Sequence, residues 1–286
     1  MNKISSTFAM LQGQISDWLH SPRTFISGMV ILALTYMNAR SYAFTLESNE
    51  LYSYFGEGVF YFLSSGFGNV TLVSALFLVM MAEIPRRTLY QNAMLIRASR
   101  LRWLMSQVLF CLATTALMMV LMLVLSMLMT LPALAPGSGW SDLERLAANP
   151  EAEWMMQLTP EYIRVISPLQ ASVLAAVVLY SFWFTMTLVI LFCTLLGHPN
   201  IGLMVYISVL VLQVTVLWEE LPPWLRYMPV DFATLTAVGA KFMEHELETA
   251  PIVIAVYVGL DLLITGLMYF KTKTMDLFFI GKDVSE

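Results

Sequence analysis

The chain has 286 residues, of which 58% are hydrophobic and 12% charged, and its mean hydropathy is +0.72. A soluble domain of this length could not bury so much apolar surface, so this composition excludes an ordinary soluble protein. The net charge of −5 is less informative than its distribution along the chain, and two cysteines provide no disulfide framework. We expect no nucleic acid among the partners.

Residues 1–20 predict an amphipathic helix that lies on the membrane surface. Its apolar residues recur at helical spacing, at Ile4, Phe8, Leu11, Ile15, Trp18 and Leu19. Polar residues such as Lys3 and Gln14 lie between them, and Pro22 ends the pattern. A packed core helix is the alternative, but the position just before the first long apolar block favours a surface helix.

Six apolar blocks follow, several of them longer than the roughly 18 residues that mark a spanning helix. They cover residues 24–38, 59–81, 103–131, 168–196, 201–218 and 252–270. The sequence therefore predicts an all-α membrane protein whose single transmembrane domain covers residues 1–286.

The segments between the blocks differ in character. Glu47, Glu50 and Glu57 predict an acidic loop after the first block, and residues 132–167 predict a long outer loop. Residues 219–251 contain several prolines and are too interrupted to span. We expect helices there that lie at the interface or enter the membrane partway.

The distribution of Lys and Arg predicts the orientation. Ten of the fifteen lie on one side of the six predicted spans, at Lys3, Arg23, Arg86, Arg87, Arg97, Arg100, Arg102, Lys271, Lys273 and Lys282. Since cytoplasmic loops are enriched in these residues, this side is predicted to be cytoplasmic. Both termini then lie in the cytoplasm, which agrees with an even number of spans.

Catalytic and metal-binding motifs are missing from the sequence. There is no phosphate-binding G-x-x-x-x-G-K-[ST] and no H-E-x-x-H. The cluster Glu244-His245-Glu246 is typical of a solvated helix face, with surface metal binding as the alternative. We therefore expect no catalytic residue, cofactor or metal on this chain.

Asp261 is the one ionisable residue deep in a predicted span. A carboxylate there costs about 2.5–3.5 kcal/mol of insertion free energy, so it must face protein or water. Tyr257 and Thr265 lie one helical turn on either side, and Asn69 and Gln213 are polar residues of other spans. These five residues are candidates for a substrate path or a proton site, and an inter-helix hydrogen bond at Asp261 is the alternative.

The segment 83–102 is polar and basic and predicts a short amphipathic helix. Leu89, Ala93 and Ile96 share one helical face, between two spans on the predicted cytoplasmic side. The segment is either a basic loop beside anionic lipid or a docking helix for a cytoplasmic partner.

With these elements in this order, the chain resembles the membrane subunit of type-2 ATP-binding-cassette (ABC) transporters. Glu83, Arg87, Thr88, Leu89, Ser99 and Arg100 are similar to the pattern of that family's coupling helix. The Leu221-Pro222-Pro223-Trp224 stretch resembles its proline–aromatic turn. The chain departs from the pattern at Arg86-Arg87-Thr88, where the family has a glycine, and at Gln107, where a lysine is frequent.

The resemblance implies a permease with an elbow helix at 1–20, a coupling helix at 84–100 and re-entrant helices within 219–251. The implied partners are a cytoplasmic ABC ATPase that binds ATP and Mg, a second identical or different permease chain, and membrane lipid. The docking residues would be Glu83, Arg86, Arg87, Thr88, Leu89, Ala93, Ile96, Arg97, Ser99 and Arg100. The location would be the inner membrane of a bacterium and the activity export.

Two other function classes stay open. One is an intramembrane enzyme that uses Asp261, and the other is a membrane scaffold without transport. The sequence does not indicate the cargo.

Overall fold

The computed structural model describes residues 3–64, 70–85, 99–137, 139–141, 166–216 and 246–274. The helices are α1 (Lys3–Leu19), α2 (Pro22–Ser48), α3 (Glu57–Ser64), α4 (Thr71–Met81), α6 (Arg100–Thr130), η2 (Leu131–Ala133), α9 (Pro168–Leu195), α10 (Pro199–Val216) and α12 (Glu246–Thr274). The only β contact within these residues is one isolated bridge between Ser53 and Leu134. The all-α class is thereby confirmed.

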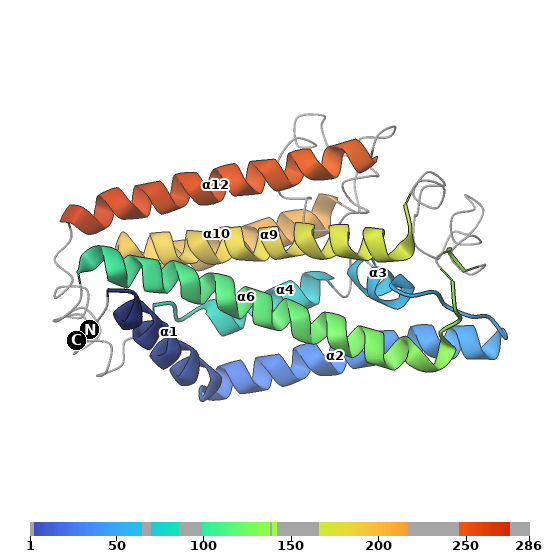
Figure 1. Ribbon diagram of the computed structural model, residues 1–286. Coiled ribbons are helices and arrows are strands. Elements are labelled where there is room, and N and C mark those ends of the chain that lie inside the picture. Colours follow the sequence, from blue (N-terminus) through green and yellow to red (C-terminus); the bar gives the residue numbers. More distant parts are fainter. Residues whose placement is uncertain are drawn as a thin grey trace.

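The long helices lie side by side along one direction, with α9 at the centre (Figure 1). α9 packs against α12, α10, α3 and α6, and α2 packs against α6 and α4. The Trp183 indole of α9 stacks on Phe77 of α4 with ring centroids 4.5 Å apart, and its N–H donates to the Ser74 hydroxyl at 2.8 Å. Tyr206 of α10 donates its hydroxyl to the Ser74 carbonyl at 3.1 Å, so α4, α9 and α10 meet at one residue.

Three segments are long and apolar enough to cross a membrane: Arg100–Ala133, Pro168–Leu195 and Ala250–Thr274. They coincide with the predicted spans at 103–131, 168–196 and 252–270 and indicate a membrane protein. Two shorter apolar helices cover Thr71–Met81 and Pro199–Leu212. The crossing of the membrane by α2, α4 and α10, and hence the total of six spans, stays a prediction.

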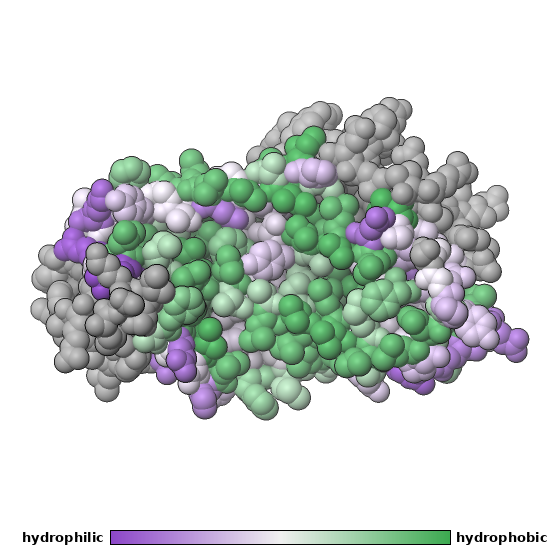
Figure 2. Space-filling model, in the orientation of Figure 1, coloured by the Kyte–Doolittle hydropathy of each residue, from purple (hydrophilic) through white to green (hydrophobic). Residues whose placement is uncertain are grey.

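The surface agrees with a membrane environment. Figure 2 shows hydrophobic residues over the middle of one face and hydrophilic residues mostly toward its two ends. Large apolar side chains point outward on α2 and α12, including Phe25, Met37, Leu262 and Phe270, each more than 60% exposed. Such a surface is stable in lipid, where apolar side chains need no cover from other protein.

The predicted acidic loop is wrong in two places. α2 continues to Ser48, beyond the predicted end of the first span at residue 38, so Glu47 is helical and pairs with Arg40 at 3.2 Å. Tyr42 lies within α2, where it packs inward and stacks on Tyr61. Glu57 is the first residue of α3 and is fully buried.

Two other boundaries differ from the predictions. α12 begins at Glu246, so the last residues of the predicted re-entrant segment, 246–251, belong to the final helix. The predicted span at 59–81 contains two described helices, α3 and α4. Residues 86–98, which make up most of the predicted coupling helix (84–100), lie outside the described residues. The same is true of Asn69, of most of the outer loop (142–165) and of the rest of the re-entrant segment (217–245).

The predicted elbow segment is helical, and its place on the membrane surface stays a prediction. Met10, Gln14 and Trp18 are buried, and α1 packs mainly on α6. Phe8 and Leu19, which were assigned to the same apolar face, are 60% and 50% exposed. The buried stripe follows i, i+4 spacing along the contact with α6, and it includes a glutamine that hydropathy alone would place outside.

Candidate functional site

At one end of the bundle, an ion pair joins α2 to the end of α4, and a hydrogen bond joins α6 to α12. Arg23 at the start of α2 forms an ion pair with Glu83, just after α4, with Nη1 2.6 Å from Oε1. Arg100 at the start of α6 donates from Nη1 to the backbone carbonyl of Lys273 near the end of α12, at 2.6 Å. We call these residues, with Arg102 and Lys271, the basic end.

Three of the predicted docking residues lie at the basic end. Glu83 and Arg100 form the contacts above, and Ser99 caps α6 by accepting a hydrogen bond from the Arg102 backbone N–H at 3.5 Å. The other predicted docking residues, Arg86, Arg87, Thr88, Leu89, Ala93, Ile96 and Arg97, lie outside the described residues. The described chain therefore enters and leaves the segment 86–98 at the basic end.

Helix α1 contacts both helices that flank this segment. The Trp18 indole donates to the Met80 carbonyl of α4 at 3.4 Å, and the edge of its ring packs on Phe110 of α6. Gln14 donates from Nε2 to the Ser106 hydroxyl of α6 at 3.4 Å. α1 therefore spans the gap between the end of α4 and the start of α6.

Asp261 lies on the side of α12 that contacts α9. Its Oδ1 accepts a hydrogen bond from the Thr185 hydroxyl of α9 at 2.6 Å. Tyr257 lies one helical turn before Asp261 on the same helix. No described basic side chain forms an ion pair with Asp261, which is half-buried.

The remaining predicted path residues lie in different surroundings. Tyr257 is fully buried and packs edge-on against Phe182 of α9, with centroids 6.4 Å apart. Thr265 is half-buried on α12, whereas Gln213 lies on α10, which packs mainly on α9 and α4. Thr185 and Tyr180 were missed by the sequence prediction. The sequence does contain a signal for them, because both are hydroxyl residues within the apolar block 168–196, and hydroxyl side chains in spans often form inter-helix hydrogen bonds.

Glu57, which the sequence analysis assigned to an acidic loop, forms a second polar centre. Its carboxylate accepts hydrogen bonds from the Tyr42 hydroxyl at 3.3 Å, the Ser53 hydroxyl at 3.0 Å, the Tyr54 backbone N–H at 3.0 Å and the Ser141 backbone N–H. It joins α2, the start of α3 and the segment 139–141. Burial raises the pKa of Glu57, and the hydrogen bonds from Tyr54, Ser141 and Ser53 oppose that shift.

No group of three or more His, Cys, Asp or Glu residues within the described part of the chain is placed to hold a metal ion. Comparison of the chain with models of protein families, with curated proteins and with solved structures gives no match.

Replacement of Thr185 by Val should lower the free energy of unfolding by about 0.5–2 kcal/mol, because it removes an inter-helix hydrogen bond within a membrane domain. Asp261→Asn should cost less, since the amide oxygen still accepts from Thr185. Thermal unfolding in detergent of Thr185→Val, of Asp261→Leu, which removes the acceptor, and of the double variant measures the coupling between the two positions, with Asp261→Asn as the control that keeps the acceptor. Additive effects would contradict a direct bond.

The stability of the wild type relative to Glu57→Gln should fall as the pH rises from below 4.5 through the raised pKa of Glu57. The native state holds the proton more tightly than the unfolded state, so between the two pKa values it loses stability as the pH increases. Thermal unfolding of both proteins across this range measures the difference. A relative gain for the wild type would mean that the four hydrogen bonds outweigh the cost of burying the charge.

Proposed function

We propose that this chain is the transmembrane permease subunit of an ABC transporter in the inner membrane of a bacterium, with both termini in the cytoplasm. A separate ATPase subunit, which binds ATP and Mg, would dock at the basic end through the segment 84–100. A second permease chain, identical or different, would complete the transporter. The observation that carries the proposal is the basic end, where paired helix ends flank a segment whose sequence is basic.

The contacts at the basic end provide a route for force. A push on the segment 86–98 would act on α4 through Glu83 and on α6 through Ser99. Because Glu83 pairs with Arg23, the push would also reach α2, and because Arg100 holds the Lys273 carbonyl, it would reach α12. Motion of the docked ATPase would therefore displace two pairs of helices as rigid bodies, as in other hinge and shear movements.

Helix α1 supports the same mechanism. Its hydrogen bonds to Met80 of α4 and Ser106 of α6 connect it to the two helices that flank the proposed coupling helix. A helix that contacts both α4 and α6 would limit how far these two helices separate. This gives the proposed elbow helix a mechanical role in addition to its expected place on the membrane surface.

Asp261 has a smaller part in the proposal. Its bond to Thr185 favours an inter-helix contact, and within the described residues Asp261 belongs to no group of three or more His, Cys, Asp or Glu residues placed to hold a metal ion. Because Asp261 is only half-buried, its carboxylate also stays available to a polar cargo in the path. Export is the direction that the family resemblance implies, and the cargo is left open.

The double variant Arg87→Glu, Leu89→Glu should lose the ATPase. A P-loop ATPase should copurify with the wild-type chain from native membranes. The variant should retain it about tenfold less, because the loss of 1.4 kcal/mol or more of interface free energy corresponds to a factor of ten. Quantitative mass spectrometry of the purified complexes measures the ratio.

The control is Leu143→Glu, Arg145→Glu, which makes the same charge changes at the same spacing in the predicted outer loop. It should leave the ATPase bound. Equal ATPase retention by the two double variants, or no P-loop ATPase with the wild type, would overturn the docking assignment.

A further inference from the structure

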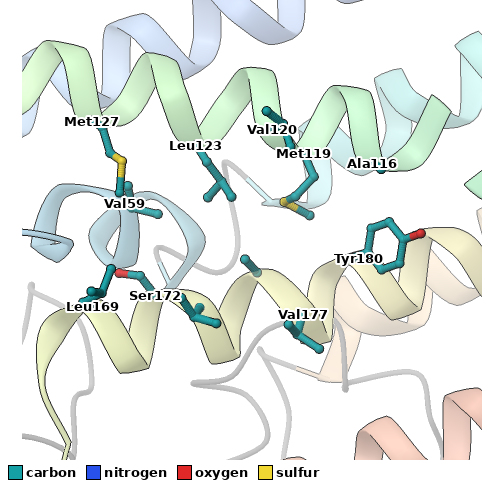
Figure 3. Close-up of a pocket in the computed structure, with 12 residues that line it drawn as sticks. Val59, Ala116, Met119, Val120, Leu123, Met127, Leu169, Ser172, Val177 and Tyr180 are labelled. Carbon is teal, nitrogen blue, oxygen red and sulfur yellow. The ribbon is translucent and has the colours of Figure 1, made fainter. Parts of the chain in front are cut away.

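An apolar groove lies between α6 and α9 and reaches α3 (Figure 3). Its volume is about 300 Å³. Ala116, Met119, Leu123 and Met127 line it from α6, and Ala176 and Val177 line it from α9. No polar atom is exposed on its wall.

Two polar residues border the groove, but their hydroxyl groups are already used. The Ser172 hydroxyl donates to the carbonyls of Gly56 at 2.6 Å and Pro168 at 2.8 Å. The Tyr180 hydroxyl donates to the Leu112 carbonyl at 3.4 Å and points away from the groove, so only its ring faces the cavity (Figure 3). A ligand in the groove would therefore meet apolar atoms alone.

The shape of the groove restricts its occupant. The lining residues cover 116–127 of α6 and 169–180 of α9, which corresponds to about 17 Å along each helix. All of the open space in the groove, including its mouth, is about 740 Å³, which over that length gives a mean cross-section of about 44 Å². A helix about 10 Å across needs roughly 80 Å², so the groove is too narrow for a helix and fits a thinner apolar chain.

The surroundings supply such a chain. α6 and α9 are two of the helices that are long and apolar enough to span a membrane. The rim residues Val120 and Val173 are 54% and 55% exposed, so the groove opens to the surface that would face lipid. We infer that the groove between α6 and α9 is a binding site for one acyl chain of a membrane lipid. This inference does not depend on the proposed transport function.

Photolabelling tests the site in the full-length chain. The protein is reconstituted in phospholipid vesicles that contain a phospholipid with a photoreactive diazirine in one acyl chain, and labelled peptides are quantified by mass spectrometry. Labelling at 116–127 and 169–180 should exceed that of the lipid-facing residues Leu262 and Leu263 of α12 by about threefold. The excess is modest because packing alone, without transfer from water, favours the groove.

A matched pair of variants locates the label. Ala116→Phe should fill the groove and remove the excess labelling, whereas Ala255→Phe, on the exposed side of α12, should leave it unchanged. If Ala116→Phe fails to fold, the labelling pattern of the wild type decides alone. Equal labelling of all lipid-facing helices would mean bulk lipid only. Crosslinking of groove residues to a second copy of the chain would mean that protein occupies the groove, and either result would overturn the inference.

Discussion

The hydrogen bond from the Trp183 indole to the Ser74 hydroxyl holds the centre of the bundle together. Trp183 and Ser74 are both fully buried. A polar group in this position must be paired inside the protein because lipid offers no donor or acceptor. Ser74 also receives the Tyr206 hydroxyl on its carbonyl, so one residue of α4 joins α9 and α10. The stacked rings of Trp183 and Phe77 add apolar contact around the bond. With α9 fixed to α4 and α10, the faces left for α12, α6 and α3 are determined.

The same constraint explains how the bundle connects its centre to its ends. Within the spans, hydroxyl side chains such as Thr114 and Thr187 donate to carbonyls of the preceding turn, which leaves few polar contacts between helices. The inter-helix polar contacts that remain include Asp261–Thr185, Glu57 with its four donors and the pairs at the basic end. A bundle joined mainly by packing and by a small number of fixed bonds can tilt in parts without unfolding. The proposed coupling mechanism requires that property.

Hydropathy was sufficient to predict the helical class and the three long apolar helices, because membrane spans depend on local composition. The partners of buried polar residues were not predictable. Glu57 was assigned to an acidic loop because two of its donors, on Tyr42 and Ser141, are 15 and 84 positions away and become neighbours only after folding. The same holds for Asp261, which is 76 positions from Thr185. α2 extends past Arg40 to Ser48, and the Arg40–Glu47 ion pair lies within this extension, which a boundary drawn from hydropathy does not include.

The central claim is that the basic end, with the ends of α4 and α6, faces the cytoplasm. Single cysteines at two exposed serines, Ser99→Cys near the basic end and Ser48→Cys at the opposite end of α2, test it with a membrane-impermeant maleimide. The background is Cys193→Ser, since Cys111 is fully buried. We expect Ser48→Cys to react in intact cells and Ser99→Cys to react only after the membrane is opened. Labelling of Ser99→Cys in intact cells would contradict the account.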